Sequence, residues 1–258
     1  MKRFLTACLS ILLLISCADE KKGNNSFKEK NLNFFSRTVE KNLDDCLPEE
    51  GNCTFISLKF PFADESKPEA EKINKKIENF IGKTVDFQED SITKKPEALA
   101  ENFIKEYKET ASEFPEYELP WEATINGKIN YQSSEIISIK FDTYMFTGGA
   151  HGYRSTNFLN FDAQTGEILT PEDIFIAEFT DYVEKEFRKK QEIPMGASIN
   201  STGMFFENDE FHLPENIGIS KDSVVMHYNA YDIAPYSEGI FVLTYSKEDV
   251  KQFLKIKK

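Results

Sequence analysis

The sequence predicts an α+β fold in which antiparallel sheets are covered by amphipathic helices. Apolar residues recur at helical spacing in some segments and alternate with polar residues in others, which are the periods of helices and strands. Helices and then strands follow one another in two successive runs, without regular βαβ alternation. Short turns join most of the neighbouring strands, and this favours antiparallel pairing.

The first run contains one strand and two helices. Residues 53–62 alternate and predict a strand that Pro61 ends. Apolar side chains at helical spacing predict amphipathic helices over residues 66–83 and 94–114, and Gly82 is expected to stop the first of them. Each helix would cover one face of a sheet with its apolar side.

Asn126-Gly127 is a dipeptide that normally marks a hairpin turn. Here the alternation of apolar residues continues unbroken from residue 121 to residue 131. We therefore expect one long strand, with Gly127 on its inner face. A turn at 132–135 and a partner strand at 137–145 follow.

The second run begins with a strand-like segment at residues 153–162. A helix-capping pattern starts at Thr170, and apolar spacing between Phe179 and Phe187 predicts a helix. From Phe211 onward the chain reads mainly as short strands, and a short capped helix closes it.

The N-terminus has the pattern of a secretory signal. Lys2 and Arg3 precede an apolar run that is shorter than the roughly 20 residues of a membrane-spanning helix. The junction "LISC" resembles the lipobox of bacterial lipoproteins, which implies that residues 1–16 are removed and that Cys17 carries lipid. Several acyl chains on one cysteine would anchor the protein firmly in a membrane. Residues 17–35 are polar and read as a flexible tether.

Cys46 and Cys53 bracket a proline and a glycine and would lie in a compartment that permits oxidation. This favours a disulfide that closes a small loop. A metal site and two reduced thiols are the alternatives. The loop-entropy estimate for such a disulfide is roughly 2.5 kcal/mol.

The composition is acidic, with a formal net charge of −13. Loss of Lys2 and Arg3 with the signal removes two positive charges and gives −15. This balance argues against nucleic acid as a partner and favours solubility or a cationic partner.

Two stretches are candidate binding or structural motifs. The first is "TGGAHG" at residues 147–152, and the second is "HYNAYDIAPYSEG" at residues 227–239. The glycines suit a tight strand connection, and tyrosines beside a proline make good contact surfaces. The candidate residues are Gly148, Gly149, His151, Gly152, Tyr228, Tyr231, Pro235, Tyr236 and Gly239.

No complete catalytic signature accompanies His151. The sequence has no GxSxG, no P-loop and no GxGxxG motif. His151, His212 and His227 lack the close spacing that places two imidazoles on one face for zinc. We therefore expect a protein without enzymatic activity, metal or cofactor.

Together, "YMFTGGAHGYRSTNFLNFDAQTGEIL" and "YNAYDIAPYSEGIFVLTY" resemble RsiV/PdaC-like extracytoplasmic proteins. The resemblance implies a PdaC-like part at residues 36–152 and an RsiV-like part at residues 153–258. RsiV-type anti-sigma factors bind lysozyme, and PdaC-type proteins are peptidoglycan deacetylases. The cytoplasmic and spanning segments of the former and the deacetylase domain of the latter have no counterpart here, so neither activity is carried over.

The sequence thus predicts a lipid-anchored protein of the bacterial cell envelope that binds a ligand such as lysozyme or a peptidoglycan-related glycan. Two alternatives stay open. One is a hydrolase or deacetylase-like enzyme that acts on envelope polymers through His151. The other is a structural or assembly factor of the envelope.

Overall fold

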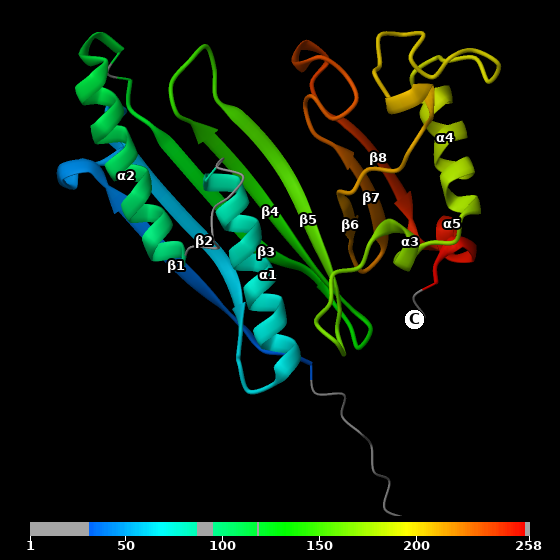
Figure 1. The fold of residues 1–258 in the computed structure, drawn as a ribbon. Coiled ribbons are helices and arrows are strands. Elements are labelled where there is room, and N and C mark those ends of the chain that lie inside the picture. The colour runs from blue at the N-terminus through cyan, green and yellow to red at the C-terminus, as the bar shows by residue number, and fades with distance from the viewer. Residues whose placement is uncertain (1–30, 87–94, 118, 256–258) are drawn as a thin grey trace, which may run out of the picture. The chain divides into compact units, whose positions relative to one another are not determined.

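The structure is a computed structural model and describes residues 31–86, 95–117 and 119–255. These residues build two sheets, each with its own helices (Figure 1). The strands are β1 (Phe34–Asn42), β2 (Phe55–Ala63), β3 (Glu122–Gln132), β4 (Ile136–Phe146), β5 (Tyr153–Asp162), β6 (Ile217–Ile219), β7 (Ser223–Tyr228) and β8 (Phe241–Ser246). The helices are α1 (Pro68–Val85), α2 (Pro96–Glu113), α3 (Pro171–Ile174), α4 (Glu178–Lys190) and α5 (Lys247–Val250). The predicted α+β class is confirmed.

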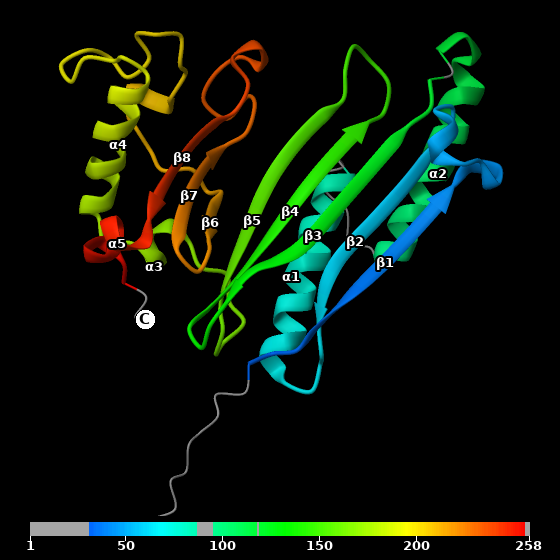
Figure 2. The same ribbon diagram turned by 180° about the vertical axis from the view of Figure 1, so that it is seen from behind.

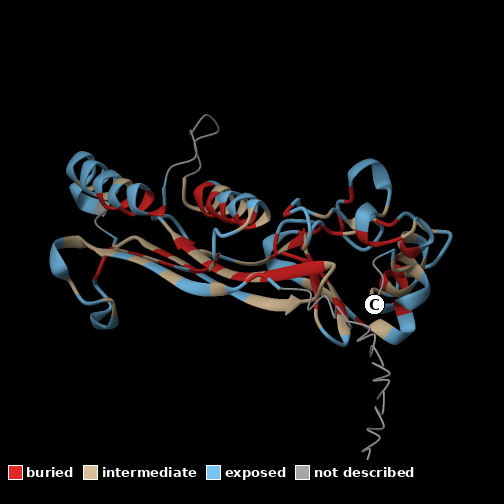
Figure 3. Cartoon of the chain, turned by 90° about the horizontal axis from the view of Figure 1, so that it is seen from below, coloured by how far each residue is buried: buried red, intermediate tan, exposed pale blue. Residues whose placement is uncertain are grey.

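The first sheet has five strands in the order β1-β2-β3-β4-β5. Its pairs are antiparallel except β2 with β3, which run parallel. The expectation of purely antiparallel pairing is wrong at this one place, because α1 and α2 carry the chain back across the sheet between the two strands. Both helices lie on the same face of the sheet (Figure 3).

Two predicted end points are also wrong. β2 continues through Pro61, which lies opposite Ser36 of β1. The pairing of β2 with β3 ends at Lys59, so the missing N–H of the proline costs no hydrogen bond on that side. Helix α1 continues past Gly82, because one glycine in a helix costs only about 1 kcal/mol and the helix is held by its buried face.

The long strand predicted through Asn126-Gly127 is confirmed as β3. A Cβ atom on Gly127 would lie 2.5 Å from the ring of Phe141 on β4. Glycine is therefore needed here for the close approach of an aromatic ring and not for a turn.

The core under α1 and α2 consists mainly of isoleucine, leucine and a few aromatic residues. Ile73, Ile77 and Ile81 of α1 pack against Ile56 and Leu58 of β2, and all of them are fully buried. The opposite face of the sheet is in large part half-exposed or exposed (Figure 3), but Ser138 and Asn160 on it are buried and form hydrogen bonds with residues of β6. On that face Lys140 forms an ion pair with Asp142 at 2.7 Å.

The second sheet is antiparallel, with the order β6-β7-β8, and α4 packs on it (Figure 2). Its core is rich in aromatic rings. Phe187 of α4 lies 5.5 Å from both Phe206 and Phe211, measured between ring centroids. The strand expected at Phe211 is absent, since residues 210–214 form no regular element; Phe211 and Leu213 of this segment pack against the core.

The outer edge of β5 is covered by asparagine side chains instead of another strand. The side chain of Asn229 accepts a hydrogen bond from Thr156 N–H at 2.8 Å and donates one to Thr156 C=O at 3.1 Å. Asn160 of β5 in turn donates to Ile217 C=O at 2.7 Å. These bonds join the two sheets. The predicted division at residue 152 stays a prediction, but β5 belongs to the first sheet.

The predicted disulfide is confirmed, with Cys46 and Cys53 bonded and their Cα atoms 5.5 Å apart. Cys17 and the predicted signal lie outside the described residues, as does most of the predicted tether. Within the described ranges, no helix combines the length and the apolar character needed to cross a bilayer.

Candidate functional site

The segment "TGGAHG" forms the loop of the β4–β5 hairpin. Gly148 and Gly149 have φ angles of 95° and 94°, which favour glycine. A Cβ atom on Gly152 would lie 2.4 Å from the ring of Tyr144. The predicted need for glycine at these positions is therefore explained by backbone angle and by close approach.

His151 meets the second motif in space although some 80 residues separate them. Its ring stacks on that of Tyr236, with centroids 4.2 Å apart and an interplanar angle of 17°. Tyr231 lies 5.4 Å from Tyr236, and Tyr153 lies 6.5 Å from Tyr231. We call His151, Tyr153, Tyr231 and Tyr236 the aromatic cluster. Tyr231 is 53% exposed and Tyr236 is 40% exposed, so the cluster faces solvent.

Tyr231 is held in a backbone conformation that bulky residues rarely adopt. Its φ angle is 72°. Such a conformation costs on the order of 1–3 kcal/mol and is common where a side chain must be presented for binding. Pro235 precedes the short 3-10 turn that contains Tyr236, and Gly239, with φ of 74°, follows that turn.

Buried polar contacts hold the loop that carries these tyrosines. Asn229, only 4% exposed, bonds both backbone groups of Thr156. The hydroxyl of Tyr153 donates to Ala230 C=O at 3.1 Å, and Asn229 N–H donates to a carboxylate oxygen of Asp232 at 2.7 Å. The exposed rings therefore project from a fixed backbone.

Tyr228, a predicted candidate residue, does not join the aromatic cluster. It is 1% exposed, and its hydroxyl donates to His212 C=O at 2.6 Å. Burial raises the pKa of this hydroxyl well above its ordinary value, which keeps it a neutral hydrogen-bond donor. Tyr228 is a core residue, and its hydroxyl end reaches a groove.

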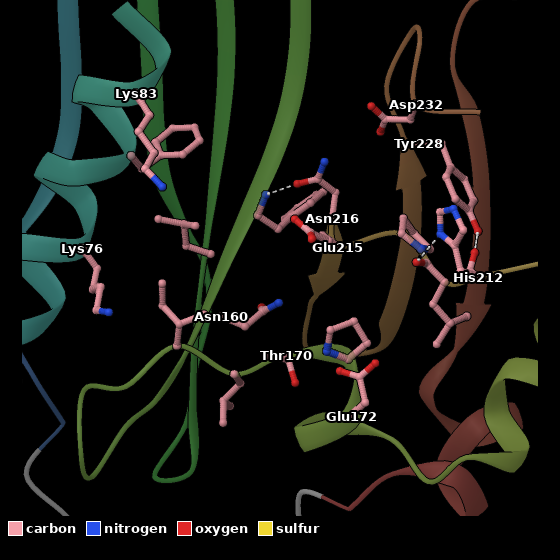
Figure 4. A pocket seen from close by; sticks show the side chains of 18 of the residues that line it. Lys76, Lys83, Asn160, Thr170, Glu172, His212, Glu215, Asn216, Tyr228 and Asp232 are labelled. Atoms are coloured by element: carbon pink, nitrogen blue, oxygen red, sulfur yellow. Dashed lines mark hydrogen bonds between the residues drawn. The ribbon is translucent and has the colours of Figure 1, made fainter. Parts of the chain in front are cut away.

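That groove, of about 970 Å³, lies where the two sheets meet (Figure 4). One wall is α1 with Lys76 and Lys83, and the floor is β5 with Asn160. The other wall comes from residues 168–172 and 212–216 and from Asp232. Sequence reasoning missed this groove because its walls come from distant segments, although lysines seven positions apart on one helix lie on the same face.

Electrostatics differ between the walls of the groove. Glu172, Glu215 and Asp232 lie opposite the lysines of α1. Burial, and also the nearby charge of Glu215, raises the pKa of the Asp232 carboxyl, although its bond from the Asn229 N–H acts in the other direction. The groove is thus basic on one side and acidic on the other.

The aromatic cluster and the groove are both surfaces suited to binding a ligand. His151 Nδ1 lies 3.0 Å from the carbonyl oxygen of Gly152, and within the described residues it contacts no carboxylate that could orient it as a base. Among the same residues no group of three or more histidine, cysteine, aspartate or glutamate side chains could hold a metal ion.

Family models match most of the folded chain. The model described as "Deacetylase PdaC" matches residues 47–154, and that of a protein family of unknown function, DUF3298, matches residues 167–246. The first includes β2 to β4, and the second includes α3 to β8.

The chain is similar to a peptidoglycan-N-acetylmuramic acid deacetylase, PdaC, of Bacillus subtilis, with 25% identity over 141 residues. The match covers 52% of this chain and 29% of the relative, so the chain spans less than a third of that enzyme. The similarity indicates an extracytoplasmic, envelope-associated protein.

Two crystal structures of DUF3298 proteins share the fold. The protein from Bacteroides fragilis has a TM-score of 0.64 at 22% identity, and that from Pseudomonas aeruginosa has 0.59 at 18%. Both alignments cover 88% of this chain and 96% of the other. The chain is a two-part protein, in which a PdaC-like part precedes a DUF3298-like part.

Proposed function

We propose that the chain is a lipid-anchored cell-envelope protein that binds a protein or glycan ligand without catalysis, through the aromatic cluster. The observation that supports this most is the meeting of His151 with Tyr231 and Tyr236 on an exposed surface. Exposed tyrosines on a fixed backbone bury much area at low entropic cost when they bind.

Lysozyme and peptidoglycan-derived glycan are the two ligands we propose. The net charge of −13 would attract a cationic protein such as lysozyme, and the resemblance to RsiV-type proteins points to the same partner. Aromatic rings that stack on sugar faces would suit a glycan, and the similar Bacillus subtilis protein is a peptidoglycan deacetylase.

Calorimetry of the intact chain with lysozyme and with muropeptides tests the proposal. The variants Tyr231→Ala and Tyr236→Ala should each weaken binding about tenfold or more, as expected for central aromatic contacts. Phe114→Ala is the matched control, because Phe114 is 51% exposed but follows α2, in the other part. If neither ligand binds, or if the control weakens binding equally, the proposal is wrong.

Anchoring through lipid on Cys17 is part of the proposal. We expect the protein in the membrane fraction and Cys17→Ser in the soluble fraction, with mass spectrometry locating the lipid on the mature N-terminal cysteine. Acylation at another residue, or membrane association that survives Cys17→Ser, would contradict it.

The enzymatic alternative uses His151 and is favoured by the similarity to a deacetylase. It predicts that His151→Ala abolishes release of acetate from peptidoglycan while the melting temperature stays nearly unchanged. The absence of any acetate release and of any hydrolysis of peptidoglycan by the unaltered chain would eliminate this alternative, which includes both a deacetylase-like enzyme and a hydrolase. A stable complex with another envelope protein, without binding of lysozyme or glycan, would instead favour an assembly factor.

A further inference from the structure

The groove between the sheets has a charge arrangement that the aromatic cluster does not explain. Lys76 and Lys83 extend from α1 along one wall, and Figure 4 shows them across the groove from the acidic residues Glu172 and Asp232. In the part of the chain that the structure describes, neither lysine forms a hydrogen bond or an ion pair. Lys76 acts on the Glu167 carboxylate only through its charge, so the ammonium groups of both lysines keep their hydrogen-bond donors for a ligand.

The rest of the groove is suited to a small amphipathic molecule. Its apolar lining includes Phe80 of α1, Phe158 of β5, and Leu213 and Pro214 from the segment before β6. Its volume of about 970 Å³ lies at the upper end of the range of small-molecule sites. A peptide of three to five residues would fit a space of this size.

The floor adds a polar atom without a partner. Asn160 is 3% exposed, and its amide nitrogen is used by the carbonyl oxygen of Ile217. Its Oδ1 has no hydrogen-bond partner among the described residues. A buried acceptor without a partner costs free energy, which an N–H donor of a ligand would recover.

We propose that this groove binds a short peptide with free ends, whose carboxylate faces Lys76 and Lys83 and whose ammonium group faces Glu215 and the acidic wall. The apolar side chains of such a peptide would lie against Phe158 and Leu213, and its backbone N–H groups lie above Asn160. This binding is independent of the aromatic cluster and of the ligand proposed for it.

The test is calorimetry of the intact chain with the tripeptide Leu-Ala-Leu, which carries one carboxylate, one ammonium group and apolar side chains. The same peptide with an acetylated N-terminus and an amidated C-terminus is the matched ligand control. We expect the free peptide to bind at least tenfold more tightly than the blocked one, since about 1.4 kcal/mol, or tenfold, is within reach of two charge-assisted contacts at opposite ends of the groove.

Variants test the contributions of the basic wall and of the acidic wall to peptide binding separately. Lys76→Met with Lys83→Met should weaken binding of the free peptide about tenfold and leave the blocked peptide unchanged. Lys75→Met is the control, because Lys75 is an exposed residue on the same helix and does not line the groove. Glu215→Gln should weaken binding in the same direction, with the exposed, non-lining Glu210→Gln as its control.

Three results would each overturn the proposal: no binding of the free peptide below about 10 mM, equal affinity for the blocked peptide, or equal losses in the control variants. Thermal unfolding of each variant identifies any that fails to fold. Tyr236→Ala should leave peptide binding unchanged, so the outcome is separate from that for the aromatic cluster.

Discussion

The five-stranded part and the three-stranded part of this protein build their cores differently. The first uses long strands and two helices of 18 residues each, and its core is mainly aliphatic. The second uses short strands, one longer helix and extended loops, and its core combines aliphatic residues with the large rings of Phe179, Phe187, Phe206 and Tyr228. Large rings fill the space between irregular segments, where regular alternation of small aliphatic side chains is not possible.

The two parts also differ in how irregular their backbone is, and both candidate sites include irregular segments of the second part. Four of the non-glycine residues with positive φ, among them Tyr231, lie after α4. The aromatic cluster combines a hairpin loop of the first sheet with a loop of the second, and the groove lies at their junction. The candidate binding groups thus lie where irregular backbone meets a regular sheet.

The largest expected effect compares the two cores directly. Phe187→Ala should lower the free energy of unfolding by about 3–5 kcal/mol, because the buried ring contacts several other rings. Ile77→Ala, the matched change in the first core, should cost about 2–5 kcal/mol. Urea denaturation measures both. A loss below about 1 kcal/mol for Phe187→Ala would mean that the second core repacks and does not depend on its rings.

Removal of the disulfide tests the first part alone. The double variant Cys46→Ser and Cys53→Ser should lose roughly 2.5 kcal/mol, mainly because the unfolded chain gains entropy. Reduction of the unaltered protein should give a similar loss, and reduction of the double variant should give none. Equal stability of the oxidised and reduced protein would contradict the prediction.

The connection between the parts depends on Asn229. Asn229→Ala should cost about 1–3 kcal/mol, since it leaves both backbone groups of Thr156 at the β5 edge without their partners. Asn157→Ala is the control, because Asn157 lies next to Thr156 on β5 and its side chain donates a hydrogen bond only to the nearby Ser155 hydroxyl. Thermal unfolding of both variants is the measurement, and equal losses would remove the special role of Asn229.

The smallest expected effect has the opposite sign. Tyr231→Gly should raise the free energy of unfolding by about 1 kcal/mol, since glycine adopts the positive φ without strain. Tyr236→Gly should lower it, because Tyr236 has no such backbone angle and loses its stack with His151. Urea denaturation of the pair decides the matter. Destabilisation by both would show that the Tyr231 ring contributes more than its backbone conformation costs.

Local patterns determined much of this protein. Alternation identified β3 through Asn126-Gly127, helical spacing identified α1 and α2, and two cysteines in a short loop identified the disulfide. The glycine angles of the β4–β5 loop and the capping box at Thr170 also follow from neighbouring residues. Each of these features depends on interactions between residues close in sequence, and so it can be predicted from the sequence.

The tertiary structure alone decided the rest. The parallel pairing of β2 with β3 depends on where two helices return the chain, and the stack of His151 on Tyr236 joins segments far apart in sequence. The groove needs α1, β5 and residues 212–216 to converge. Such contacts are set by the packing of whole elements and by the asparagine hydrogen bonds at the β5 edge. The sequence does not predict them, because no period or spacing within one segment indicates which distant segment lies beside it.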